Sequence, residues 1–91
     1  METIIISKIS DISFRVVVEA STTTEHRVSI SESYYRQLTN GKVSHEELLR
    51  KSFEFLLRRE SNTSILTSFE LPLIGRYFPD YERIIKSRLE G

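Results

Sequence analysis

The sequence contains no cysteine and no tryptophan, and only three glycines and two prolines. Without cysteine, neither a disulfide framework nor a thiolate metal site can reinforce the fold. A chain of 91 residues folded as one small domain buries only roughly 60 to 65% of its unfolded surface. Association with a second copy is the remaining common way to stabilise such a domain, and we therefore expect a homodimer.

An excess of charge is also absent. The 13 basic residues balance the 13 acidic ones, so no overall charge attracts nucleic acid, membranes or acidic ligands, and any charge-driven function must come from local patches. The isoleucines at residues 4–6 form a run too short for a signal sequence, and no apolar run approaches the length of a membrane span. The sequence predicts a cytoplasmic protein that does not bind membranes.

Motifs for catalysis and for metal or phosphate binding are missing as well. There is no G-x-S-x-G nucleophile motif, and the glycines at positions 41, 75 and 91 lie too far apart for a phosphate-binding loop. His26 and His45 stand without the spacing of metal ligands, and we expect structural or solvated roles for both. We therefore expect no enzymatic activity, no cofactor and no metal site.

Hydrophobic periodicity predicts one α+β domain over residues 1–91. An N-terminal β-hairpin or short antiparallel sheet is expected within residues 1–30, because apolar and polar residues alternate there. A helix-turn-helix pair is expected at residues 31–60, followed by an apolar helical tail at 61–91, which gives three to four short helices in all. No repeat or linker divides the chain.

In the expected hairpin, the even-numbered residues from Ile12 to Ala20 face the core. The register that we predict pairs Ala20 with His26, Val18 with Val28, Val16 with Ile30 and Glu19 with Arg27. The turn at residues 21–24 contains no glycine or asparagine, so a longer loop with a shifted register stays open.

Capping residues predict the two central helices. Ser31 begins the first helix, and Asn40 with Gly41 ends it. Ser44 begins the second, and Glu47 three residues later completes a capping box. The second helix is expected to reach about residue 60, with i,i+4 ion pairs Glu46–Arg50, Glu47–Lys51 and Glu54–Arg58.

The apolar residues of the second helix cover about half of its circumference, which predicts packing against two surfaces. In the tail, Ile65, Leu66 and Phe69 suggest a helical turn that ends before Pro72. Pro79 fits the first turn of a final helix. The tail is apolar and aromatic, so it either completes the core or docks on a partner.

Residues 25–60 carry a resemblance to a known family. A strand from Glu25 leads into a serine-capped helix, then Gly41, then a second serine-capped helix with the motif Leu48, Leu49, Arg50. This order resembles the ribbon-helix-helix superfamily of Arc- and MetJ-like repressors. The resemblance implies a dimeric DNA-binding regulator or antitoxin, in which two chains pair their strands and place them in the major groove of duplex DNA.

The resemblance also implies particular contacts. The base-reading side chains would be Glu25, Arg27 and Ser29. The phosphate contacts would come from Val43, Ser44 and His45 at the start of the second helix. One departure is the additional strand before the reading strand, because two joined hairpins would span about 14 Å, whereas the groove is about 12 Å wide. Arg27 would then serve as the cross-strand partner of Glu19.

Two other readings remain open. One is a protein-interaction module, a homodimer or adaptor that does not bind nucleic acid. Its surface would be formed by Leu49, Phe53, Leu56, Tyr77 and Phe78, with a protein partner bound through residues 65–89. The other is a small enzyme or ligand-binding subunit whose site is assembled from scattered residues that no motif reveals.

Overall fold

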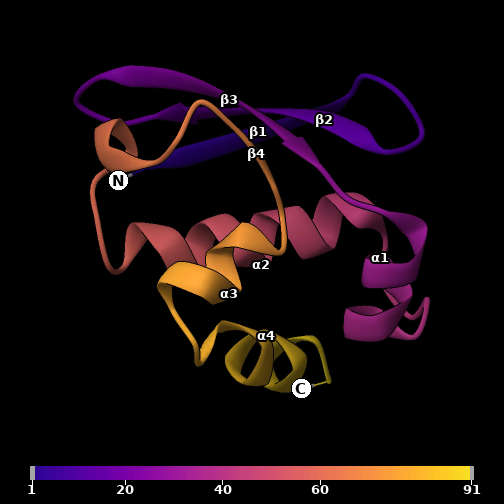
Figure 1. The fold of residues 1–91 in the computed structure, drawn as a ribbon. Coiled ribbons are helices and arrows are strands. Elements are labelled where there is room, and N and C mark those ends of the chain that lie inside the picture. The colour runs from indigo at the N-terminus through magenta and orange to yellow at the C-terminus, as the bar shows by residue number, and fades with distance from the viewer. Residues whose placement is uncertain (1, 91) are drawn as a thin grey trace.

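The computed structural model describes residues 2–90, apart from the side chain of Glu90, as a β-sheet with helices packed on one face (Figure 1). The strands are β1 (Thr3–Lys8), β2 (Ser13–Glu19), β3 (Thr23–Ser29) and β4 (Ser68–Glu70). The helices are α1 (Glu32–Thr39), α2 (His45–Leu57), α3 (Leu73–Tyr77) and α4 (Tyr81–Glu90), with a 3-10 turn, η1, at Asn62–Ser64. The predicted α+β class is confirmed. In the described part of the chain, no helix has the length and apolar character needed to cross a membrane.

The sheet has the strand order β1-β2-β3-β4. The first three strands form an antiparallel meander, whereas β4 pairs with β3 in parallel. The predicted helical turn at Ile65, Leu66 and Phe69 is therefore wrong, because Phe69 lies in β4 and pairs with Val28. Its ring also packs on Phe53, with a centroid distance of 6.3 Å. Residue 69 is therefore held in an extended conformation by contacts with residues distant in sequence.

The predicted hairpin register is also wrong. Val16 pairs with His26, Val18 pairs with Thr24, and Glu19 pairs with Thr23 rather than with Arg27. The chain turns within residues 20–22, which is shorter than expected. Sliding a strand by an even number of residues keeps every side chain on its face. The alternation therefore identified the core face within both strands but not their register. It was wrong for Ile12 and Ala20, which lie just outside β2 and are exposed.

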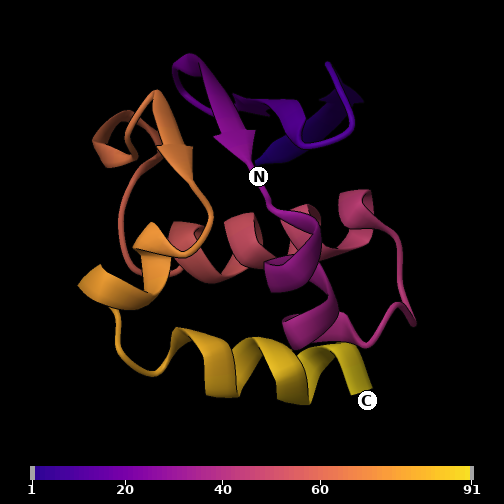
Figure 2. The ribbon, with the colours of Figure 1, turned by 45° about the vertical axis from the view of Figure 1, so that its right-hand side comes forward.

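Helix α2 lies between the sheet and α4, as Figure 2 shows. Four of its apolar side chains are completely buried: Leu48, Leu49, Phe53 and Phe55. The face of the sheet toward this helix is formed by buried side chains of β2 and β3: Phe14, Val16, Val18 and Val28. The prediction that this helix packs against two surfaces is confirmed.

The predicted helix boundaries at Ser31 and Ser44 are confirmed. The Ser31 hydroxyl accepts a hydrogen bond from Tyr34 N at 3.2 Å, and the Ser44 hydroxyl accepts one from Glu47 N at 3.1 Å. Helix α1 ends at Thr39. Asn40 caps it with φ 54°, and Gly41 follows with φ 73°, a left-handed conformation that glycine adopts without strain. Helix α2 ends at Leu57, earlier than predicted.

The ion pairs along α2 differ in part from the prediction. Glu47 pairs with Lys51 as predicted, at 3.9 Å. Lys51 also contacts Glu54, at 3.8 Å. The guanidinium of Arg50 instead donates from Nη1 to the carbonyl oxygen of Ile4 at 3.0 Å, which ties the helix to the first strand.

The C-terminal tail completes the core. Leu71, Ile74, Tyr81 and Ile85 are buried. Phe55 of α2 meets Tyr81 edge to face, at a centroid distance of 5.2 Å. Helix α4 begins at Tyr81, so Pro79 precedes the helix and does not lie in its first turn as predicted.

Candidate functional site

Both histidines are held by structural contacts. His26 is completely buried, and its ring nitrogens contact the carbonyl oxygen of Leu66 at 2.7 Å and the hydroxyl of Thr24 at 2.8 Å. The ring of His45 stacks on Tyr35 at a centroid distance of 3.8 Å and lies 5.7 Å from Phe14. His26 therefore fixes the chain before β4 to β3, and His45 fixes the start of α2 under β2.

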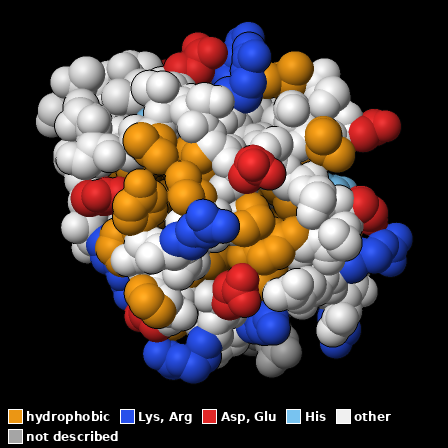
Figure 3. Space-filling view, viewed as in Figure 1, with side chains coloured by type: hydrophobic (Ala, Val, Ile, Leu, Met, Phe, Trp, Pro, Cys, Tyr) orange, Lys and Arg blue, Asp and Glu red, His pale blue; other side chains and the backbone are white. Residues whose placement is uncertain are grey.

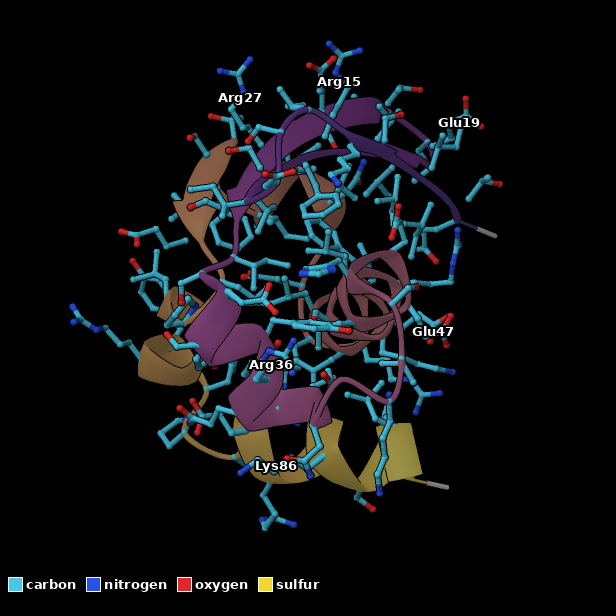
Figure 4. All side chains as sticks on the ribbon, turned by 90° about the vertical axis from the view of Figure 1, so that its right-hand side faces the viewer. Arg15, Glu19, Arg27, Arg36, Glu47 and Lys86 are labelled. Carbon is cyan, nitrogen blue, oxygen red and sulfur yellow. The ribbon has the colours of Figure 1, made fainter. Side chains whose placement is uncertain are left out.

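The predicted base-reading residues Glu25, Arg27 and Ser29 lie on the face of β3 opposite the helices. Figure 4 shows Arg15 and Arg27 projecting away from the helical layer. Arg27 lies opposite Arg15 in the register, and Arg15 pairs with Glu25 at 3.3 Å. The predicted contact between Arg27 and Glu19 is wrong, because Glu19 lies at the other end of the strand pair.

Both edges of β3 are occupied. Strand β2 pairs along one edge, and β4 pairs along the other from Arg27 to Ser29. Arg27 N donates to Thr67 O at 2.8 Å, and Leu71 N donates to Ser29 O at 2.9 Å. In a two-chain ribbon, β3 would pair at this second edge with its copy. Such a ribbon through β3 would require β4 to leave the sheet.

The predicted phosphate-contacting residues Val43, Ser44 and His45 lie together at the start of α2. The Val43 carbonyl and the side chains of Ser44 and His45 already have partners. The Val43 carbonyl accepts from the Tyr35 hydroxyl, the Ser44 hydroxyl caps the helix, and His45 Nε2 lies 3.6 Å from a carboxylate oxygen of Glu32. Glu46 and Glu47 add negative charge in the first turn, which opposes the binding of an anion there.

The predicted interface residues divide into two groups. Leu49 and Phe53 are completely buried in the chain's own core, so a partner cannot reach them in this fold. The remaining three line an open groove of about 410 Å³ between α2, β4 and α3. The groove is lined by Leu56, Glu60, Ser64, Ile65, Leu66, Phe69, Leu73, Ile74, Tyr77 and Phe78. We call it the apolar groove.

Two side chains of the apolar groove are strongly exposed for apolar residues. Tyr77 is 65% exposed and Leu66 is 47% exposed. Figure 3 shows that hydrophobic side chains gather in the middle of this face of the molecule. Large apolar side chains that line a hollow and are open to water are typical of a binding surface.

The outer edge of β4 borders the apolar groove. Thr67 and Leu71 direct their backbone groups toward β3, so by alternation the amide and carbonyl of Ser68 and of Glu70 point away from the sheet. In the described part of the chain these four groups have no hydrogen-bond partner. The edge therefore offers two donors and two acceptors to an added strand.

A second, more polar pocket adjoins the first one. Its volume is about 580 Å³, and it shares Phe69 and Leu73 with the apolar groove. It is lined by Ser13, Arg27, Ser29, Ser68, Phe69, Glu70, Pro72, Leu73 and Arg76. Both arginines are exposed, and within residues 2–90 neither of them forms a salt bridge. We call this the arginine pocket.

The sequence pointed to Tyr77 and Phe78 but missed the strand beside them. A strand of three residues is too short for alternation to reveal it. The sequence does show Leu66 and Phe69 as apolar residues within a polar segment. That contrast is the signal by which they could have been assigned to the site.

Comparison with known proteins gives no family for this chain: no family model matches it, and neither a curated protein nor a solved structure does. The geometry of the residues above is therefore the basis for a proposed function.

Proposed function

We propose that this protein is a non-enzymatic interaction module that binds an extended segment of another protein along β4. One observation carries the proposal: the open edge of β4 lies directly beside the apolar groove. Main-chain hydrogen bonds to a sheet edge provide affinity for an extended segment, and pockets for alternate side chains provide specificity. The two features occur together here.

The added strand would pair with the backbone groups of Ser68 and Glu70. Its side chains would alternate between the two faces of the sheet. Those on the inner side would enter the apolar groove, between Leu66 and Tyr77, and would cover the apolar surface that these residues expose. A large aliphatic or aromatic residue fits this position.

The arginine pocket sets the chemistry on the outer side. Arg27 and Arg76 together outweigh Glu70, the one carboxylate that lines this pocket. Ser68 is the residue beside Arg27 in the sheet, and its short side chain leaves room for a guanidinium to reach across β4. An acidic residue next to the apolar anchor of the bound segment would meet these charges.

Protein binding fits the charges better than DNA binding. One of the arginines on the sheet face, Arg15, is already paired with Glu25. The start of α2 is surrounded by Glu32, Glu46 and Glu47. Binding to duplex DNA requires several cations that neutralise phosphates, and neither surface supplies them.

The test is a selection of random peptides displayed on phage against the immobilised full chain. Selected peptides, once synthesised, are titrated by fluorescence anisotropy. We expect extended sequences with an apolar residue next to an acidic one. Ser68→Pro removes an outward amide, and Leu66→Lys places a charge in the groove, so each should weaken binding by about tenfold or more.

Ile12→Lys is the matched control, because Ile12 is 51% exposed but lies outside the groove. It should leave peptide binding unchanged. The proposal fails if no peptide is selected, or if Ile12→Lys weakens binding as much as Leu66→Lys. A titration with duplex DNA in the same low-salt buffer tests the alternative partner, and tight, salt-sensitive binding there would favour the regulator instead.

A further inference from the structure

The other edge of the sheet, β1, is also open. Ile9 N donates to Ser13 O at 2.8 Å across the turn that joins β1 and β2. By alternation, the backbone groups of Ile5 and Ser7 face β2, and those of Ile4, Ile6 and Lys8 face away from it. The bond from Arg50 to the Ile4 carbonyl agrees with this direction. The other outward groups of β1 have no partner within residues 2–90.

We propose that β1 pairs antiparallel with β1 of a second copy of this chain, about a two-fold axis at Ile6. Ile6 then faces the same residue of the second copy, and Ile4 faces Lys8. Each copy presents the same donors and acceptors in reverse order, which is what an isologous interface requires. The sheets of the two chains become one continuous sheet with all helices on the same side.

The side chains of β1 suit this arrangement. Ile5 is 44% exposed on the open face of the sheet, and across the two-fold axis it becomes a diagonal neighbour of the same residue in the second copy. On the helical side, Ile6 packs only in part against the core and would meet its own copy. Pairing therefore removes apolar surface from water on both faces of the sheet.

The side chain of Arg50 leaves the edge of β1 open to a second copy. α2 packs against β1, and Arg50 reaches the edge from that helix. Arg50 keeps its bond to the Ile4 carbonyl, because that oxygen has a second lone pair for the added strand.

The two edges of the sheet are unequal partners for self-pairing. β1 has six residues, whereas β4 has three. A contact from β1 to β4 of the next copy would be heterologous, and it would continue into a filament rather than close. The proposed pairing of β1 with itself closes as a dimer and leaves β4 free. It is therefore independent of the proposed peptide site.

The test is the molar mass of the full chain by light scattering on a sizing column over a range of concentrations. We expect a dimer for the natural sequence and a monomer for Ile6→Pro, because proline removes the central outward amide of β1 and none that faces β2. Ser68→Pro is the matched control at the other edge. It should remain a dimer while it loses peptide binding, whereas Ile6→Pro should keep peptide binding.

If Ile6→Pro does not fold, as judged by circular dichroism, Ile5→Lys replaces it. That variant places like charges near the two-fold axis from an exposed position, and we expect the dissociation constant of the dimer to rise by about tenfold or more. A monomer at every concentration overturns the proposal. So does a dissociation constant that is unchanged in Ile5→Lys, or a mass that keeps rising with concentration, since the latter indicates open-ended pairing.

Discussion

The two edges of the sheet present the same backbone chemistry but differ in length and in what lies beside them. β1 is a six-residue strand rich in isoleucine, and one of its outward carbonyls is held by Arg50. β4 is a three-residue strand beside a groove of about 410 Å³. A long apolar edge can pair with its own copy through backbone groups alone. A short edge needs side-chain pockets to hold a partner. The comparison suggests how one sheet can separate self-association from the binding of another protein.

The largest expected effect comes from removing the support under β4. Phe53 is completely buried and packs on His26 and Phe69, at 5.4 and 6.3 Å between ring centroids. Phe53→Ala should lower the free energy of unfolding by about 3 to 5 kcal/mol. Denaturant unfolding measures this loss, and amide hydrogen exchange should show faster opening around β4 than in β1. Equal acceleration in both strands would contradict the comparison.

A smaller effect is expected from replacing His26. Its ring in β3 contacts the carbonyl of Leu66, which lies in the segment that leads into β4. His26→Ala removes two hydrogen bonds and leaves the partly buried carbonyl of Leu66 without its partner. We expect a loss of about 1 to 3 kcal/mol, together with weaker peptide binding. The proposed dimer should be unaffected, because β1 does not depend on this contact; a variant that is monomeric while the natural sequence is dimeric would show that the two edges are coupled.

Alkaline pH should loosen the helical layer that lies beneath both edges. Burial raises the pKa of Tyr81, whose hydroxyl lies 2.6 Å from Ser52 Oγ. Burial and then a hydrogen bond to Glu82 raise the pKa of Tyr34. A raised pKa in the folded state means that stability is fully present below the unfolded value of about 10 and is lost as pH rises above it. Melting temperatures measured between neutral and alkaline pH should fall more steeply for the natural sequence than for Tyr81→Phe.

The smallest expected effect on stability distinguishes the surface of the groove from the core. Leu66→Lys and Ile12→Lys both change exposed apolar residues, so each should alter the free energy of unfolding by no more than about 0.5 kcal/mol. Only the first should affect peptide binding. A large loss of stability in Leu66→Lys would mean that this residue belongs to the core rather than to the binding surface.

Local features of the fold were predictable from the sequence. Ser31, Ser44 and Asn40 act within their own turns of chain, and each holds the position predicted for it. The face of each strand in the hairpin also followed from alternation. Such features depend on neighbours in sequence, which a single sequence displays directly.

Features that depend on distant residues were not predictable. The register of β2 and β3 is set by a tight turn and by core packing, while the apolar pattern is satisfied by any even shift. β4 is held in the sheet because Phe69 pairs with Val28 of β3 and packs on the ring of Phe53. The candidate site was not predictable for the same reason, because its residues are far apart in sequence. Tyr77 was recognisable as apolar, but the strand edge and the arginines beside it come together only in the fold.

The parallel pairing of β4 has a kinetic consequence. It joins residues that are separated by the whole of α1 and α2, whereas β1, β2 and β3 pair through short connections. Contacts between residues far apart in sequence require costly loop closure and tend to form late in folding. Substitutions at β4 should therefore mainly accelerate unfolding and change the folding rate little, while substitutions in the meander should slow folding. The proposed peptide site would then be the last part of the molecule to assemble and the first to open.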